Sequence, residues 1–345
     1  MPCLIPALPG TGGSVRVSEE DFRVEELPLY PASGEGEHLY LTVEKKGRTT
    51  QDVVRELAAR LGISEREIGS AGLKDKRAVT VQRLSVPLRS CPAPLELAGA
   101  GFRVLEALRH GNKLRTGHLR GNRFRIAVRG CGEGALERAR EACAWLSANG
   151  AANLFGPQRF GQRQDNAALG AAILARDPAA ARAGRDRFLR RLALSALQSE
   201  LFNRCLSARI SDGLFACALD GDVLRKRETG GLFVSQNPGA DTARVVAAEI
   251  DPAGPLPGHA VLAAQRVALL REQAVLEEAA IDPRSFAAGG GEMEGARRPY
   301  RIPVEDLSVE ADGDALVLSF ALPRGSYAAS VLREVMKEAA AGLPG

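Results

Sequence analysis

The chain has 345 residues, which allows two domains or one elaborated domain, and 45% of its residues are hydrophobic and 26% are charged. This composition is typical of a globular protein and excludes disordered and collagen-like chains, and we find neither a long apolar run nor a secretory signal, so we expect a cytoplasmic protein with no membrane span. The net charge of +4 is modest, but its distribution along the chain matters more for a polyanionic partner than its total.

The N-terminal part of the chain is predicted to open with sheet. Alternation of apolar and polar residues predicts strands over residues 14–26, 39–43 and 78–86. Apolar residues at helical spacing predict a helix over residues 51–61 that ends at Gly62. A second short helix over residues 63–69 begins at Ser64 and leads into a loop over residues 70–76.

Positive charge gathers between two further predicted strands, over residues 102–108 and 122–128. Between Arg103 and Arg129 there are eight Lys or Arg residues and one acidic residue, Glu106. This excess of cations favours a phosphate-binding surface. The alternative is a solvated pair of strands whose charges only keep the protein soluble, which is the usual meaning of an isolated charge run.

The remainder of the chain is predicted to contain an insertion. Helical spacing predicts helices over residues 134–149, 186–210 and 264–280. Apart from the last of these helices, residues 211–299 are rich in turn sequences. A strand over residues 315–322 and a C-terminal helix ending near Ala341 follow. The return of strand pattern indicates a segment inserted into a core that both ends of the chain form.

The most informative segment, residues 70–82, reads SAGLKDKRAVTVQ. It places Asp75 among three cations, Lys74, Lys76 and Arg77, in a loop that contains glycine. Nearby positive charge stabilises the ionised form of a carboxylate, which is the form that acts as nucleophile or base at neutral pH. Taken alone, such a segment is more often an exposed charged turn.

A second segment, residues 153–161, reads NLFGPQRFG. Phe155 offers a stacking face, Asn153 can hydrogen-bond the edge of a uracil, and Arg159 can hold a phosphate. Such a loop could bind a base that has left its stack. The alternative, which the residues support about equally, is a turn in which Phe155 and Phe160 belong to the core.

Metals and nucleotide cofactors have no support in the sequence. The six cysteines contain no C-x-x-C pair, and the four histidines form no H-E-x-x-H or similar ligand pair. The glycine run at residues 10–14 precedes a predicted strand and lacks the Lys-Ser/Thr ending of a phosphate-binding loop. We therefore expect reduced thiols, no metal and no cofactor.

Six ordered segments of the chain resemble the TruD family of tRNA pseudouridine synthases. They are Glu20–Glu26, Ala71–Thr80, Arg109–Arg129, Asn153–Gly161, Arg191–Ala196 with Leu201–Asn203, and Pro323–Tyr327. The departures are Leu154, where the family often has Tyr, and Tyr327, where Phe is frequent. Both replacements keep an apolar body, so neither weakens the resemblance. The resemblance spans most of the chain and is weakest over residues 179–301.

The resemblance implies an α+β fold with two parts. A pseudouridine-synthase catalytic core with a mixed, largely antiparallel sheet is expected over residues 1–178 and 302–345. A smaller inserted α/β domain, the TRUD domain, is expected over residues 179–301. The family's cleft for tRNA lies between these two parts.

The resemblance also implies an activity: isomerisation of a tRNA uridine, at position 13 of the D arm, to pseudouridine without a cofactor. Asp75 is then the catalytic nucleophile. Together with the two loops above, the resemblance assigns substrate contacts to Phe22, Asn153, Tyr327, Phe155, Arg16, Lys74 and Lys76. The expected partner is tRNA, and we expect a monomer with no obligate protein partner.

Two other functions fit parts of the sequence. An RNA-binding or RNA-folding protein without catalytic activity could use the same basic residues, but phosphate binding alone needs no carboxylate such as Asp75 among its cations. An RNA methyltransferase would need a cofactor loop after a parallel strand, and we find none in the sequence. The carboxylate among cations therefore favours the isomerase.

Overall fold

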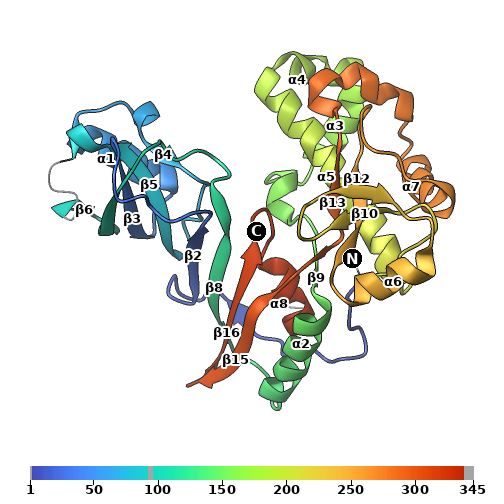
Figure 1. The fold of residues 1–345 in the computed structure, drawn as a ribbon, viewed down its shortest axis with the longest axis horizontal. Helices are drawn as coiled ribbons and strands as arrows, with labels where there is room; N and C mark the ends of the chain where they lie inside the picture. The colour runs from blue at the N-terminus through green and yellow to red at the C-terminus, as the bar shows by residue number, and fades with distance from the viewer. Residues whose placement is uncertain (1, 92–95, 338–345) are drawn as a thin grey trace. The chain divides into compact units, whose positions relative to one another are not determined.

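The structure is a computed structural model that describes residues 2–91 and 96–337 (Figure 1). Within these residues the chain forms two compact units. The large-sheet unit comprises residues 10–147 and 304–325, and the helix-rich unit comprises the described residues up to 9, residues 148–303, and the described residues from 326. Each unit is built from segments that are far apart in the sequence.

The large-sheet unit contains a sheet of ten strands in its described part. The strands are β1 (Ser14–Val15), β2 (Phe22–Pro28), β3 (His38–Lys46), β4 (Gly69–Ser70), β5 (Val79–Pro87), β6 (Ala98–Gly99), β7 (Phe102–His110), β8 (Leu119–Arg129), β15 (Glu305–Asp312) and β16 (Ala315–Pro323). The main order is β15-β16-β8-β2-β5-β3-β7-β6, with β1 paired to β8 and β4 to β5. Strands β2 and β5 run parallel and the other pairs run antiparallel, so the expected mixed, largely antiparallel sheet is confirmed.

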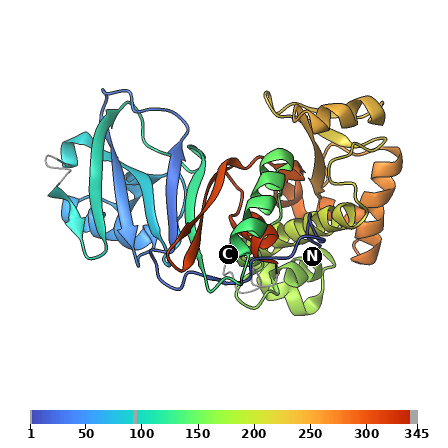
Figure 2. The same ribbon diagram turned by 90° about the horizontal axis from the view of Figure 1, so that it is seen from below.

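Helix α1 (Thr50–Leu61) covers one face of this sheet, beside β3 and β5 (Figures 1 and 2). At its N-terminus, the side chains of Thr49 and Asp52 each accept a hydrogen bond from the other residue's backbone N–H. The helix ends at Gly62, whose φ of 64° lies in the left-handed region that glycine adopts at low cost. Val53 and Leu57 of the helix pack on apolar residues of β3, β5 and β7. The short helices η1 (Glu65–Glu67) and η2 (Leu88–Ser90) and helix α2 (Ala135–Asn149) complete the elements that begin in this unit.

The helix-rich unit contains a four-stranded sheet, ordered β11-β10-β12-β13, and the short strand pair β9 and β14. These strands are β9 (Ala151–Ala152), β10 (Val223–Lys226), β11 (Leu232–Val234), β12 (Ile250–Leu256), β13 (Ala296–Pro299) and β14 (Arg301–Ile302). The helices are η4 (Pro157–Phe160), α3 (Asn166–Leu174), η5 (Pro178–Ala180), α4 (Ala181–Arg185), α5 (Arg187–Ser211), α6 (Pro238–Val246), α7 (Arg266–Glu278), η6 (Pro283–Met293) and α8 (Ala329–Met336). The long helix α5 packs against β12, α3 and α7 and so connects the sheet of this unit with its other helices.

The prediction of a single helix and otherwise turns over residues 211–299 is wrong. This stretch contains the four-stranded sheet and α6 in addition to α7. Its longest strand, β12, reads IDPAGPL, and Pro252, Gly254 and Pro255 are residue types that disfavour strands. The sequence of β12 therefore shows no strand pattern, although most of its residues are buried in the structure. The predicted end of the C-terminal helix near Ala341 lies outside the described residues.

The boundaries of the inserted domain, residues 179–301, stay a prediction. The chain passes from one compact unit to the other after residues 9, 147, 303 and 325, and this division does not test which segment is an insertion. No helix within the described ranges is long and apolar enough to cross a membrane.

Candidate catalytic site

The carboxylate of Asp75 lies in the loop that joins β4 to β5 in the large-sheet unit. Arg16 reaches it from the segment after β1, with Nη2 2.9 Å from Asp75 Oδ2. The Asp75 side chain keeps 41% of its surface exposed, whereas the Arg16 side chain keeps 11%. The carboxylate is therefore accessible to a substrate and is held by a cation that is mostly buried.

Arg16 also covers the aromatic ring of Phe22, the first residue of β2. The guanidinium carbon lies 4.1 Å from the centre of the Phe22 ring, a cation–π contact. Phe124 packs edge-on against Phe22, with the ring centres 6.3 Å apart. Only 4% of Phe22 is exposed. The structure thus brings three predicted site residues, Arg16, Phe22 and Asp75, into one cluster.

Lys45 binds the backbone of the Asp75 loop. The sequence analysis did not identify this residue. The Lys45 ammonium donates to the carbonyl oxygens of Asp75 at 2.7 Å, Arg48 at 2.8 Å and Lys74 at 3.3 Å. Lys45 is buried, and this burial lowers the pKa of its ammonium to about 8. The signal was present in β3, where Lys45 shares the inward face with Leu41 and Val43 at a spacing of two.

Lys74 is turned inward as well. Its Nζ donates to Asn122 Oδ1 at 2.7 Å and lies 3.1 Å from Glu26 Oε2, in an ion pair whose side chains are 7% and 2% exposed. Its backbone N–H donates to Thr50 Oγ1 at 2.9 Å. Lys74 therefore anchors the loop, and its predicted contact with substrate stays a prediction.

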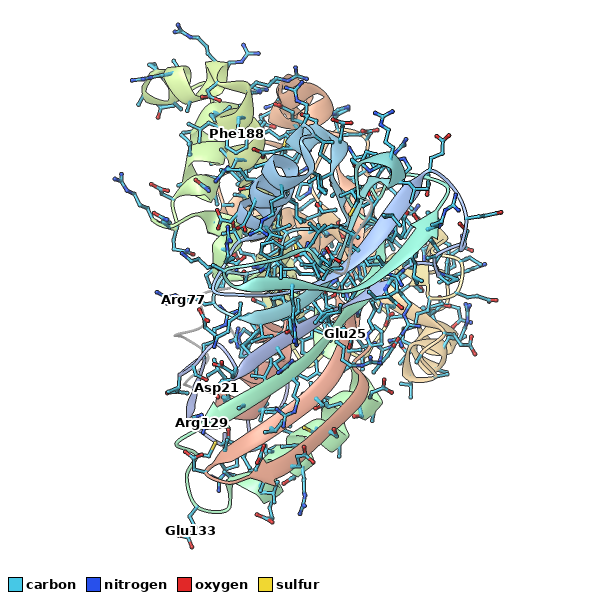
Figure 3. All side chains as sticks on the ribbon, turned by 90° about the vertical axis from the view of Figure 1, so that its left-hand side faces the viewer. Asp21, Glu25, Arg77, Arg129, Glu133 and Phe188 are labelled. Carbon is cyan, nitrogen blue, oxygen red and sulfur yellow. The ribbon has the colours of Figure 1, made fainter. Side chains whose placement is uncertain are left out.

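Lys76, on the other side of Asp75, is exposed, as is Arg77, whose position Figure 3 labels. These two cations flank the carboxylate on the solvent side and are free to approach a phosphate. Lys45 of β3 and Lys74 of the loop thus hold the loop backbone, whereas Lys76 and Arg77 of the loop are exposed.

In the helix-rich unit, Asn153 is 4% exposed and its amide is already engaged. Its Nδ2 donates to the carbonyl oxygen of Pro299 at 2.8 Å, and Arg298 donates to its Oδ1. Its backbone N–H donates to the carbonyl oxygen of Tyr300 at 2.9 Å. The predicted uracil-reading amide is therefore fixed in orientation by the residues around β13.

Phe155 lies beside the same arginine and is 7% exposed. The Arg298 guanidinium carbon is 4.2 Å from the centre of its ring, Phe202 packs edge-on at 5.6 Å, and Tyr327 lies 6.5 Å away. Asn203 binds both the N–H and the carbonyl oxygen of Phe155, at 2.9 and 3.0 Å. Phe155 is thus packed as a core residue is, one of the two alternatives that its sequence left open.

Arg298, which the sequence analysis did not single out, links these residues. It contacts Asn153 and Phe155, and burial lowers the pKa of its guanidinium to about 10. Arg298 lies within residues 211–299, for which the sequence predicts mainly turns, so no sequence pattern marks it. Within this unit, the structure brings together Asn153, Phe155 and Tyr327 around Arg298.

The excess of cations between Arg103 and Arg129 is largely neutralised by neighbouring strands. Five of the eight pair with carboxylates: Arg103 with Glu44, Arg120 with Glu305, Arg123 with Glu25, Arg125 with Asp312, and Arg129 with Asp21 and Asp314. Figure 3 shows Asp21, just before β2, close to Arg129, the last residue of β8. These contacts favour the alternative of a solvated strand surface over much of the segment.

Comparisons with known proteins agree with one another. The family model described as tRNA pseudouridine synthase D (TruD) matches residues 1–184 and 185–335. The chain is 55% identical over 339 residues to tRNA pseudouridine synthase D of Anaeromyxobacter dehalogenans strain 2CP-1, covering 98% of this chain and 96% of that protein. It is 43% identical over 340 residues to the protein of the same name from Thermus thermophilus, covering 97% of this chain and 92% of that protein.

A solved structure supports the fold. The chain resembles the crystal structure of a Methanosarcina mazei protein assigned to tRNA pseudouridine synthase D, with a TM-score of 0.78, 24% identity, and coverage of 97% of this chain and 95% of that one. The expected α+β class is confirmed by this likeness. With relatives this similar along nearly the whole chain, the protein belongs to the TruD family of tRNA pseudouridine synthases, isomerases that act on RNA, as its sequence motifs predicted.

Proposed function

We propose that this protein converts one uridine of tRNA to pseudouridine with Asp75 as its catalytic nucleophile, and that the target, from the resemblance, is uridine 13 of the D arm. The observation that carries the proposal is the setting of Asp75. Its side chain is 41% exposed and pairs with Arg16. Its loop is held in place by Lys45, which binds the loop backbone, and by Lys74, which pairs with Glu26. A positioned, accessible carboxylate is what covalent catalysis requires.

The reaction is an isomerisation and balances without an external reactant. The bond between N1 and C1′ breaks, the uracil turns, and a bond forms between C5 and C1′, while C5 loses a proton and N1 gains one. No electrons are exchanged, so the chemistry calls for no redox cofactor. The Asp75 carboxylate can add to the sugar, add to the base, or assist removal of a sugar proton, and the proposal covers all three.

The residues proposed to contact the substrate form two groups. Arg16, Phe22, Lys74 and Lys76 belong to the large-sheet unit, and Asn153, Phe155 and Tyr327 belong to the helix-rich unit. Arg16 offers a specific donor, because its Nε is buried and has no hydrogen-bond acceptor among the described residues. A buried donor without a partner is costly, so a movement of the Arg16 side chain that brings Nε to a carbonyl oxygen of uracil would be favoured.

The experiment compares the wild-type protein with Asp75→Asn on an unmodified tRNA transcript, with pseudouridine mapped by mass spectrometry. Asp314→Asn serves as the control, because Asp314 is a 76% exposed carboxylate of the same unit and also pairs with an arginine. We expect pseudouridine at position 13 with the wild type and with Asp314→Asn, and none with Asp75→Asn. Turnover by Asp75→Asn would overturn the role of Asp75, and modification at another position would overturn only the target.

Location and assembly complete the proposal. A tRNA substrate is consistent with the cytoplasmic location expected from the sequence. We propose that the enzyme acts as a monomer, as expected from the sequence. Sedimentation of the purified protein tests this assignment.

A further inference from the structure

One segment of the helix-rich unit, around α4 and the start of α5, is strongly basic. Residues 176–191 contain six arginines and two aspartates, a net charge of +4 (6 − 2), which equals the net charge of the whole chain. We name the exposed part of this segment the arginine surface. It consists of Arg176, Arg182, Arg185, Arg187, Phe188 and Arg191.

The charge of this surface is not compensated. Within the described ranges of the chain, none of its five arginines forms an ion pair. The two nearby carboxylates are engaged elsewhere, because Asp177 accepts from the N–H of Ala179 and Asp186 accepts from the N–H of Leu189. This differs from the sheet, where most of the arginines between Arg103 and Arg129 face carboxylates on neighbouring strands.

The sixth arginine of the segment, Arg190, has a structural role. Its Nε lies 2.7 Å from Glu292 Oε2, and its side chain is 26% exposed. Its guanidinium also donates to carbonyl oxygens of residues 288 and 289. Arg190 ties α5 to η6, whereas its neighbours Arg187 and Arg191 project from the protein without such contacts.

Phe188 lies within the arginine surface and is 77% exposed. It is the most exposed large hydrophobic residue of the described chain and the only aromatic one among them. Figure 3 labels it near one end of the helix-rich unit, where many long side chains extend outward from the helices. Folding does not account for a ring in this position, because exposure forgoes the free energy of burying it.

The spacing of these residues places them on one side of α5. Arg187 and Arg191 are four residues apart, and Phe188 and Arg191 are three apart, so they are neighbours on the helix surface. Two like charges at a spacing of four destabilise a helix slightly, and both stand in its first turns, where positive charge is unfavourable for the helix dipole. The helix therefore carries these cations at a cost to its own stability.

We propose that the arginine surface is a second RNA-binding site, separate from the site of the target nucleoside, at which the arginines bind phosphates and Phe188 stacks on an unpaired base. This proposal rests on the proposed function only in taking the substrate to be RNA. Unpaired guanidiniums around an exposed ring are the combination that single-stranded nucleic acid fits, since phosphates neutralise the cations and any base offers a face for stacking. Such a site recognises unpaired nucleotides with little regard to base identity, so it would hold a loop or bulge of the tRNA.

The experiment measures tRNA affinity as a function of salt for Arg187→Gln/Arg191→Gln. Glutamine retains helix propensity. The matched control is Arg204→Gln/Arg284→Gln, which also removes two charges from the helix-rich unit but takes them from arginines paired with Glu200 and Asp282. Each lost phosphate contact should reduce the slope of log K against log salt by about 0.7 to 0.9, and two contacts correspond to roughly a 25- to 60-fold loss of affinity at 0.1 M salt. The control should change the slope little.

Phe188→Ala tests stacking without a change of charge. Loss of one base–aromatic contact should weaken binding by about 5- to 150-fold, with an unchanged salt slope and an unchanged melting temperature, because the ring is exposed. For every variant the single-turnover rate at saturating tRNA should stay at the wild-type value, since Asp75 and its loop are untouched. A wild-type protein that makes no pseudouridine would contradict the proposed function, and these binding results would still stand.

The proposal is overturned if Arg187→Gln/Arg191→Gln retains both wild-type affinity and wild-type slope. It is also overturned if Phe188→Ala changes the sedimentation of the free protein but not its affinity for tRNA, because the ring would then belong to a protein contact. Equal losses in the paired-arginine control and the test variant would show that only total charge matters and would likewise remove the site.

Discussion

Arg16 reaches the carboxylate of Asp75, at 2.9 Å, from a backbone in the left-handed region with φ 61°. A non-glycine residue in this region costs about 1 kcal/mol or more, and such strain tends to occur where function requires it. The ion pair with Asp75 and the stacking on Phe22 are the contacts that hold it there. The geometry near the proposed nucleophile is thus obtained at the expense of local stability.

This relationship predicts similar activity but different stability for two substitutions of Arg16. Arg16→Gly and Arg16→Ala both remove the guanidinium, so both should lower the single-turnover rate to a similar extent. Glycine tolerates positive φ, so Arg16→Gly should be more stable than Arg16→Ala by about 1 kcal/mol. Urea unfolding and single-turnover assays on the same samples measure both quantities. Equal stability of the two variants would show that residue 16 is not strained.

Lys45 predicts a loss of activity at alkaline pH. Burial lowers the pKa of its ammonium to about 8, so the group is charged below that pH and loses a proton above it. The neutral amine has two N–H donors instead of three, and the carbonyl oxygens of Arg48, Lys74 and Asp75 then compete for them. We expect the rate to fall above about pH 8. Lys45→Met should be slow at all pH values and lack this transition, whereas Lys46→Met, at the exposed neighbouring position, should keep it.

The same pKa shift predicts how stability depends on pH. In the unfolded chain Lys45 binds its proton up to its ordinary pKa of 10.5, but in the folded protein only up to about pH 8. Between these values the unfolded state binds more protons, so the contribution of Lys45 to stability rises with pH in that window. The difference in unfolding free energy between wild type and Lys45→Met should therefore shift in favour of the wild type from pH 8 to pH 10. No such drift would contradict the shifted pKa.

The buried pair Lys74–Glu26 predicts strong coupling between two substitutions. Removing one member leaves an uncompensated charge in the protein, so Glu26→Leu and Lys74→Met should each cost roughly 3–5 kcal/mol, and the double variant much less than their sum. A double-mutant cycle in urea measures this. If Lys74 acts by anchoring the loop, Lys74→Met should slow catalysis while leaving the salt slope of tRNA binding unchanged. A flattened slope would instead support direct contact with a phosphate.

Most elements of the large-sheet unit could be predicted from the sequence, because they depend on local patterns. Helix α1 has apolar residues at helical spacing and Gly62 at its end, and both features appear in the structure as predicted. Asp75 could be located by its motif and by the cations beside it. The burial of Lys74 could not, since its partner Glu26 is 48 residues away and is brought to it by the parallel pairing of β2 with β5.

The charge run between Arg103 and Arg129 shows the same limit. Counting residues along the chain found one acidic residue, whereas the sheet brings in Glu25, Glu44, Glu305 and Asp312 from other strands. Two of these come from β15, which follows the segment by about 180 positions. Conversely, Arg187 and Arg191 at the start of α5 are exposed and form no ion pair with any described residue, although Arg190 between them pairs with Glu292. Local charge density predicts a binding surface only where tertiary neighbours do not neutralise it.

Phe155 provides the sharpest test of the two meanings that a loop aromatic can have. Its ring is 7% exposed and packs on Phe202 and under Arg298, so Phe155→Ala should cost roughly 3–5 kcal/mol of stability. That result alone would not separate a core residue from one that also receives a base. Phe155→Leu is the better variant, because it keeps most of the volume but removes the flat face that a base or a guanidinium needs.

The matched control for this test is Phe202→Leu, since Phe202 is fully buried and touches Phe155 edge-on. Both leucine variants should lose stability to a similar extent, of the order of 1–2 kcal/mol. If Phe155 captures the target base, Phe155→Leu should lower the single-turnover rate at low temperature more than it lowers tRNA affinity, because phosphate contacts dominate affinity. Phe202→Leu should leave that rate near the wild-type value. Equal rates for the two variants would assign Phe155 to the core alone and leave Phe22 and Tyr327 as the aromatic contacts of the nucleoside.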